Sequence, residues 1–319
     1  MQNAPKPKRH HWWPQLQSKY WAGPDGLVNV VKADGTTFKS APINIGVEGE
    51  LYTRLELTGS KDTTIESWFS EKIEGPFLSA LRTILDPTQI HARPLLDIPP
   101  KEATQQIKSL GFVVNDLYET IAISPQIRAA IVSYLAAMVV RNPRYLTKLR
   151  DFHRHHSNLG KLDLPPESVI RSVALDNMLH VMSIYEERLQ TATIMMIVGP
   201  EQSDLMFSDA GFTTTEPWRN DPLPFDIHAP LTPNVALEVF PMSLADPLEI
   251  LVGRLNHQGV KRMNRLTVGG AERFVFTRSP PPLAFIKKHF GVPSPAAFGH
   301  RVINGGLETI YDPSRDRPL

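Results

Sequence analysis

Histidines near the N-terminus could carry out acid–base chemistry. His10 and His11 stand beside Trp12 and Trp13, in a segment that is too rich in aromatic residues for a flexible tail. Imidazole titrates near neutral pH, so it can act as a general base, as a hydrogen-bond donor to phosphate or as a metal ligand. Adjacent residues of an extended segment point to opposite faces, so we expect only one of the two histidines to enter a site. The alternative is a structural histidine that fixes the N-terminal segment to a loop.

Carboxylates further along the chain could share this chemistry. Glu66 and Glu74 lie eight residues apart in a segment with helical periodicity, so they share a helix face if Pro76 leaves the helix intact. Such a pair could hold a divalent cation, Mg²⁺ or Mn²⁺, or act with His11 as acid and base. Asp209 ends a predicted strand and could orient His11 or bind a metal. The alternatives are a solvated helix face, a helix-dipole role for Glu66 and a turn stabilised by Asp209.

A group of basic residues provides candidate substrate-binding side chains. Arg254, His257, Lys261 and Arg265 recur at steps of three and four residues, which places them on one face of a predicted helix, where they could contact phosphates. Asn264 lies nearer the buried side and is expected to form structural hydrogen bonds. Arg254, Lys261, Arg265 and Asn264 are therefore the candidate substrate-binding residues. A polar surface with no ligand is the alternative.

Composition excludes several classes of site. The 319 residues carry a formal net charge of +1 and include no cysteine, which excludes disulfides, thiol nucleophiles and cysteine-ligated zinc. The histidines of the segment 153–156 have no carboxylate at ligand spacing and make a weak zinc site. The N-terminus has no apolar signal core, and the longest apolar run, 129–140, is too short to span a bilayer. We therefore expect a cytoplasmic protein without membrane association.

The elements that must position these residues indicate an α+β fold. We expect the N-terminal hairpin to join a mostly antiparallel C-terminal sheet, with a helical block over about 63–189 packed on it. The chain divides into a basic arm (1–9), a single domain (10–278) and a proline-rich extension (279–319). Within the domain, 10–62 is β, 63–189 is helical and 190–278 is mixed. The expected hairpin strands are 27–31 and 37–40. The expected helices are the segments starting at 63, 124 and 166, with shorter ones near 102–118, 143–155, 246–254 and 257–267. The expected C-terminal strands are 193–198, 205–207, 235–240 and 273–277.

An ordered set of short motifs resembles a known family. The motifs are His11-Trp12-Trp13-Pro14-Gln15, the hairpin 27–35, Tyr52, Ile65-Glu66, Ile73-Glu74-Gly75, Arg141-Asn142-Pro143, Phe207-Ser208-Asp209, Pro230-Leu231-Thr232-Pro233, Asn264 and 271–276. In this order they resemble the bacterial family known as domain of unknown function 4238, over roughly residues 8–278. The resemblance favours His11 over His10. The chain departs from the family pattern at Leu16-Gln17-Ser18, where members have an aromatic residue and Tyr-Leu, and at Ala210-Gly211, where members have Asn-Pro.

The resemblance implies a bacterial intracellular protein without an established activity, with some relatives associated with defence against phage. Two functions are compatible with the residues. One is a nuclease-like phosphodiesterase that binds nucleic acid, with His11 as acid/base, Glu66 and Glu74 as metal ligands or proton carriers, and Asp209 orienting His11. The other is a non-catalytic binding or regulatory module with a structural His-Trp segment. The first predicts that His11, Glu74, Asp209 and Asn264 surround one cleft. The sequence predicts no oligomeric state.

Overall fold

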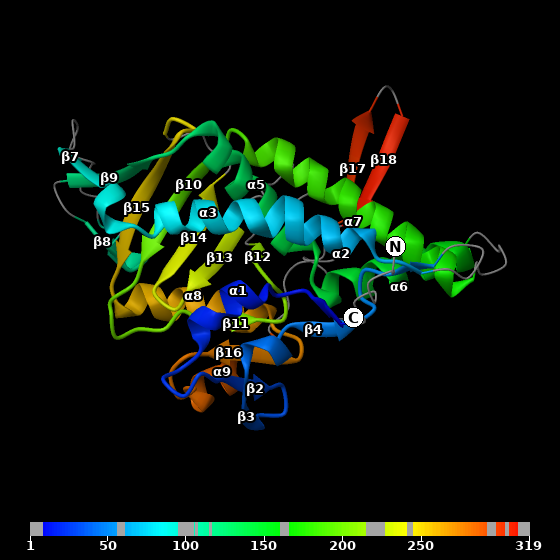
Figure 1. Cartoon of the computed structure of the whole chain (residues 1–319), viewed down its shortest axis with the longest axis horizontal. Coiled ribbons are helices and arrows are strands. Elements are labelled where there is room, and N and C mark those ends of the chain that lie inside the picture. Colours follow the sequence, from blue (N-terminus) through cyan, green and yellow to red (C-terminus); the bar gives the residue numbers. More distant parts are fainter. Residues whose placement is uncertain are drawn as a thin grey trace, which may run out of the picture.

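The computed structural model of the chain has the predicted α+β fold (Figure 1). It describes residues 9–55, 61–94, 105, 108–114, 117–159, 166–214, 227–240, 245–291, 298–303 and 306–311. The predicted basic arm lies outside the described residues, apart from Arg9. Within the described ranges, no helix is both long and apolar enough to cross a membrane.

The larger sheet has eight strands in the described part of the chain. They are β7 (Ile90–Pro94), β8 (Phe112–Val113), β9 (Leu117–Ala122), β10 (Thr193–Val198), β12 (Thr213–Thr214), β13 (Ile227–Thr232), β14 (Val235–Phe240) and β15 (Glu249–Leu255). Their order is β12-β13-β14-β10-β15-β9-β7, with β8 also pairing with β15. Neighbours are antiparallel except β10 and β15, which run parallel. One expectation is wrong here, because 246–254 contains most of strand β15 and no helix. The expected helix near 102–118 is confirmed in part: the described residues 105, 108 and 109 are helical, and the rest of the range contains β8 and the start of β9.

Helices cover one face of this sheet. They are α2 (Thr64–Trp68), α3 (Gly75–Ile84), α5 (Pro125–Val140), α6 (Pro143–Leu159) and α7 (Glu167–Leu189), with a π-helical segment, η3 (Phe69–Glu74), between α2 and α3. Helix α5 begins where the sequence predicts, since the Ser124 hydroxyl accepts the Ile127 N–H at 3.3 Å and Pro125 occupies the first turn. It is buried on most sides, and α3 and α7 both contact it. The main buried cluster includes residues of these helices and of the larger sheet, which lie next to each other in Figure 1.

A smaller sheet and helix α8 lie on the other side. The smaller sheet consists of β2 (Val28–Lys32), β3 (Thr37–Ser40), β11 (Phe207–Ser208) and β16 (Phe274–Thr277), in the antiparallel order β11-β16-β2-β3. Helix α8 (His257–Gly270) contacts both sheets, and α9 (Leu283–His289) packs on α8. The N-terminal hairpin therefore joins C-terminal strands as predicted, through the pairing of β2 with β16. It does so in a sheet separate from the larger one.

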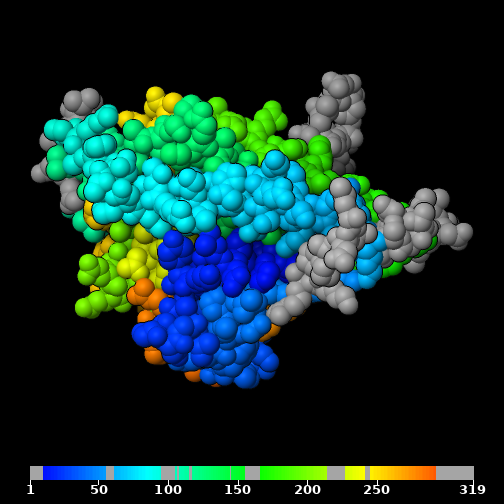
Figure 2. All heavy atoms as spheres, in the orientation of Figure 1, coloured from blue at the N-terminus to red at the C-terminus, as the bar shows by residue number. Residues whose placement is uncertain are grey.

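The N-terminal segment is wedged between these layers. It comprises β1 (Arg9–His11), α1 (Gln15–Ser18) and η1 (Lys19–Trp21), and Figure 2 shows it as a dark blue band between α3 and the smaller sheet. Trp13 is fully buried, stacked on Phe207 at a centroid distance of 4.1 Å and in edge contact with Trp21 at 5.3 Å. The Trp21 indole N–H donates to the Leu205 carbonyl at 2.9 Å. The aromatic residues of this segment therefore anchor it in the core.

Short elements complete the described chain. They are η2 (Pro42–Asn44), β4 (Val47–Gly49), β5 (Arg54–Leu55), β6 (Lys61–Asp62), η4 (Pro87–Gln89), β17 (Phe298–Ile303) and β18 (Gly306–Tyr311). Strand β1 pairs with β4, β5 with β6, and β17 with β18. The predicted extension 279–319 thus begins with a packed helix, because Ile286 of α9 is buried against Val268 and Val275.

Candidate functional site

Arg141, at the end of α5, is the centre of a buried charge network. Its side chain is only 1% exposed, and its Nη1 donates to Glu74 Oε1 at 2.6 Å. Nη2 donates to the carbonyl of His11, and Nε donates to the Tyr52 hydroxyl at 3.3 Å. The guanidinium carbon lies 4.4 Å from the centre of the Phe69 ring, within cation–π range. Three residues predicted from sequence, His11, Glu66 and Glu74, gather around this arginine, which we call the Arg141 centre.

Local structure explains why α5 ends at this point. Pro143 disfavours a helical conformation for the residue before it, so the helix cannot continue smoothly past Arg141. Asn142 bridges the break: its Oδ1 accepts the Tyr145 N–H at 2.8 Å at the start of α6, and its Nδ2 donates to the Ala210 carbonyl at 2.8 Å. The Arg141 side chain is thereby held at a fixed corner between two helices.

Glu66 contributes a largely buried carboxylate to the Arg141 centre. Its Oε1 accepts the His11 backbone N–H at 3.3 Å, and its Oε2 is a buried atom without a hydrogen-bond partner. Burial raises the pKa of Glu66, and the attraction of Arg141 and the His11 N–H only partly offset this. A carboxyl group whose pKa is moved toward neutrality can accept or donate a proton more readily than an ordinary glutamate.

Arg141 itself remains charged. Its burial disfavours the guanidinium ion, but the interactions with Tyr52, Glu74 and Glu66 outweigh the burial, so the pKa of Arg141 is raised. Burial raises the pKa of Tyr52 as well, which keeps its hydroxyl neutral. The Tyr52 hydroxyl donates to the Arg141 carbonyl and accepts from the Arg141 side chain. The centre thus combines one fixed positive charge with two carboxylates: Glu74 forms an ion pair with Arg141, whereas Glu66 accepts the His11 N–H.

The two adjacent histidines differ as predicted for an extended segment. His10 is fully buried, its Nδ1 accepts the Tyr52 N–H at 2.9 Å, and its ring stacks on Tyr52 with an interplanar angle of 9°. His11 is half-buried and joins the Arg141 centre through its backbone, which donates to Glu66 and accepts from Arg141. His10 therefore has the structural role, and His11 is the histidine beside the carboxylates.

Asp209 is engaged elsewhere. It is 3% exposed; its Oδ1 accepts the Glu272 N–H at 3.0 Å and its Oδ2 accepts the Arg273 N–H at 2.8 Å. Burial raises the pKa of Asp209 against the effect of these hydrogen bonds and of the Arg273 charge. Both oxygens thus bind the backbone that leads into β16, which matches the turn-stabilising alternative. Gly211, two residues on, has φ 72°, a value that the proline of the family pattern cannot adopt.

The four predicted substrate-binding residues do not share one face. Arg254 lies on strand β15, not on a helix, and forms a bidentate ion pair with Glu119 at 2.9 Å for both bonds. Lys261, Asn264 and Arg265 lie on α8 as predicted. Asn264 is 6% exposed and structural, since it accepts the Met206 N–H and donates to the Asp204 carbonyl, both at 2.8 Å.

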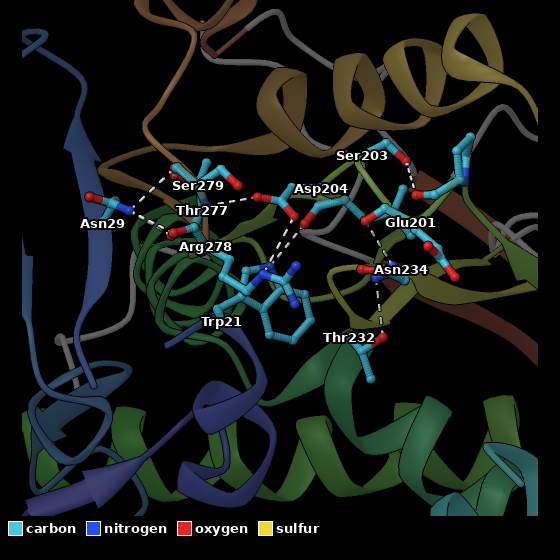
Figure 3. Close-up of polar contacts among 12 residues, drawn as sticks. Trp21, Asn29, Glu201, Ser203, Asp204, Thr232, Asn234, Thr277, Arg278 and Ser279 are labelled. Carbon is cyan, nitrogen blue, oxygen red and sulfur yellow. Dashed lines mark hydrogen bonds and ion pairs between the residues drawn. The ribbon is translucent and has the colours of Figure 1, made fainter. Parts of the chain in front are cut away.

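A pocket beside α8 contains Asn264 but none of His11, Glu74 and Asp209, the other residues expected around one cleft. Lys261 and Asn264 line this pocket of about 460 Å³ between α8, the loop 200–206 and the segment 277–285. Figure 3 shows one wall of this pocket, where the Asp204 carboxylate accepts the Ser279 N–H at 2.7 Å and lies 3.7 Å from Arg278 Nε. None of the residues lining this pocket belongs to the Arg141 centre. The pocket and the Arg141 centre therefore have no residue in common and are described separately.

The metal expectation has limited support in the geometry. Across the described residues, no group of three or more His, Cys, Asp or Glu side chains could hold a metal ion. The Arg141 guanidinium takes the Glu74 oxygen that a cation would need. Arg154, in the histidine-rich segment, pairs with Asp151 and Glu167, which is typical of a solvated helix surface.

Sequence reasoning did not assign a role to Arg141 or Tyr52, although both lie within the family motifs. One signal was present: Arg141 directly follows the apolar run of α5, and a charge at the end of a buried helix needs a carboxylate partner. The tertiary structure decides which carboxylate becomes the partner of Arg141.

Comparison with known proteins identifies the family alone. No curated protein and no solved structure shows significant similarity to the chain. A family model described as "Protein of unknown function (DUF4238)" matches residues 9–281, which include the Arg141 centre and most of the lining of the pocket. The chain therefore belongs to the DUF4238 family.

Proposed function

We propose that the protein is a nuclease-like phosphodiesterase whose acid–base group is Glu66. The observation that carries this proposal is the state of that carboxyl: it is largely buried, its pKa is raised, and Oε2 has no hydrogen-bond partner. Structural glutamates usually satisfy both oxygens, because an unsatisfied buried oxygen costs stability. An unsatisfied carboxylate beside a histidine is typical of a site that moves protons.

Each residue of the Arg141 centre has a defined part in such a reaction. Glu66 takes a proton from the attacking water, and His11, at the half-exposed edge, supplies a second titratable group for the leaving oxygen. Arg141 is too buried to touch a substrate, so it acts as a positioning residue that holds the His11 backbone and offsets the charge of Glu74.

The test is hydrolysis of single- and double-stranded RNA and DNA, with and without Mg²⁺ or Mn²⁺. We expect wild-type activity on at least one substrate and a loss of about 100-fold or more in Glu66→Gln, the usual size of an acid–base contribution. Glu71→Gln is the matched control, because Glu71 is an exposed glutamate on the π-helical segment that directly follows the helix of Glu66. Loss of activity in His11→Ala would support its assigned role. Equal rates for wild type and Glu66→Gln, or no hydrolysis of any substrate by wild type, would overturn the proposal.

A binding or regulatory module is the second candidate, favoured by the mutual satisfaction of Arg141 and Glu74 and by the structural role of His10. It predicts nucleic-acid or protein binding by wild type without turnover. The cytoplasmic location, the bacterial origin and the role in defence against phage remain predictions from the resemblance.

A further inference from the structure

The pocket beside α8 has the size and construction of a small-molecule site. Its volume of about 460 Å³ falls in the range of ligand pockets, roughly 300–1,000 Å³. It lies between three segments far apart in sequence: the loop 200–206, the first half of α8 and the segment 277–285. It shares no lining residue with the Arg141 centre, so its occupation is independent of the proposed function.

One side of the pocket is basic. His257 and Lys261 stand one helical turn apart on α8, and neither forms an ion pair among the described parts of the chain. The positive field extends along α8 and α9. Desolvation, together with the charges of Arg265, Lys288 and Lys261, lowers the pKa of His289. An uncompensated field of this kind favours an anion at the mouth of the pocket.

The lining also has an apolar part. Met206 and Val260 are buried lining residues, and the half-buried Phe285 lines the pocket together with Pro280 and Pro282. Aromatic and proline surfaces of this kind accept a planar heterocycle by stacking, as aromatic side chains do with nucleic-acid bases. The pocket therefore combines two basic side chains with an aromatic ring and two prolines.

The walls are held rigidly before any ligand arrives. Asn264 ties the loop 200–206 to α8 through Met206 and Asp204. Figure 3 shows the second tie, in which the Asn29 amide donates to the carbonyls of Arg278 at 2.9 Å and Ser279 at 3.2 Å. Such preorganisation lowers the entropic cost of binding. The only acidic side chain in the described lining, Asp204, is already paired with Arg278 and the Ser279 N–H, so it opposes an anion weakly.

We propose that this pocket binds a mononucleotide, with the phosphate at His257 and Lys261 and the base against Phe285 and the neighbouring prolines. The occupant is a single nucleotide and not a nucleic-acid strand, because one nucleotide fills a space of this volume and the lining provides one basic edge.

Isothermal titration calorimetry on the full chain tests this, with adenosine 5′-monophosphate, uridine 5′-monophosphate, adenosine and inorganic phosphate as probes. We expect at least one monophosphate to bind tenfold or more tightly than adenosine and than phosphate. Lys261→Met keeps the aliphatic stem and should weaken that binding at least tenfold. Phe285→Leu keeps the packing on α8 and should weaken it at least threefold. Arg265→Met is the control: Arg265 lies on the next turn of α8, outside the lining, and should change binding less than twofold.

Equal affinity for monophosphate and inorganic phosphate would show an anion site without a base pocket and would overturn the proposal. Equal weakening in Lys261→Met and Arg265→Met would show diffuse surface electrostatics and would overturn it as well. The proposal would also be overturned if the protein bound no monophosphate, or if it bound only a strand of RNA or DNA. Glu66→Gln should bind the monophosphate like wild type, so a failure of the proposed phosphodiesterase does not affect this test.

Discussion

Replacing Arg141 by methionine should strongly destabilise the protein, because it removes a buried charge from a network of partners. The change removes a guanidinium that is 1% exposed, together with its hydrogen bonds to Glu74, to the His11 carbonyl and to the Tyr52 hydroxyl. Methionine retains much of the volume and a contact with the Phe69 ring, so the loss is mainly electrostatic.

The magnitude follows from the partners that remain. Breaking a buried ion pair by removing one partner costs about 3–5 kcal/mol, because the other charge is left uncompensated. Glu74 is 25% exposed and recovers part of its hydration, so we expect a value near the lower end, about 3 kcal/mol. Glu74→Gln keeps a neutral acceptor opposite Arg141 and should cost about 1–2 kcal/mol, the difference between a charged and a neutral hydrogen bond. In the Arg141→Met background the same change should cost little, so the two changes couple by about 1 kcal/mol or more.

The assay is urea unfolding of the four members of this double-mutant cycle, followed by tryptophan fluorescence. Trp12, Trp13 and Trp21 are buried and should report the transition. Arg254→Met serves as the control, since its ion pair with Glu119 is partly exposed and should be worth at most about 1 kcal/mol. A loss below about 1 kcal/mol in Arg141→Met, or additive single changes, would refute the view that Arg141 and Glu74 form a buried, mutually dependent pair.

Three further predictions follow from other contacts. The pKa of Glu66 is raised in the folded state, so its ionisation destabilises the fold as the pH rises through that pKa. In urea titrations, the stability of Glu66→Gln should equal that of wild type near pH 4 and exceed it at pH 8. A stability difference that does not change with pH would contradict this prediction. Asp209→Ala leaves the N–H groups of Glu272 and Arg273 without their acceptor and should lower the free energy of unfolding by about 2–4 kcal/mol. Asp209→Asn should lower it by about half as much. Thermal and urea unfolding measure both losses, and a variant as stable as wild type would exclude the turn-stabilising role. Gly211→Ala should lower the free energy of unfolding by about 1–3 kcal/mol, because φ at this position is 72° and the new Cβ would lie 2.6 Å from the Met138 carbonyl oxygen. An unchanged free energy in the same unfolding assay would show that the alanine is not strained.

The sequence predicts best those elements whose signals are local. Helix α5 carries its own start, Ser124-Pro125, and the structure begins it there. Helix α7 begins after Pro166, as expected. Strand β15 shows the opposite case: the run Glu-Ile-Leu-Val-Gly-Arg-Leu is short and apolar, and such runs are compatible with either a helix or a strand. This run forms a strand because it pairs with β10 on one side and β9 on the other. Neither partner is close in sequence, so local signals could not predict the strand.

Three residues of the candidate site could be selected from the sequence, but Arg141, Tyr52 and their arrangement could not. Residue type and spacing were enough to select Glu66 and Glu74, and the family motif selected His11. That Arg141 would join them requires the end of α5 to meet the N-terminal segment, 130 residues earlier in the chain. Asp209 shows the same limit, because the backbone N–H groups that bind its carboxylate lie 63 and 64 residues further on. The domain boundaries at 9 and 278 stay predictions.

The pairing of β2 with β16 has a consequence for synthesis on the ribosome. Val31 lies opposite Val275, so the first hairpin of the chain finds its partner strand only after roughly 240 further residues have been made. At about 5–20 residues per second, this delay lasts on the order of 10–50 s. During that time Trp13, Trp21 and the apolar side of the hairpin have no strand β11 or β16 to cover them. The nascent chain therefore lacks the strands that cover its most aromatic segment until translation is nearly complete.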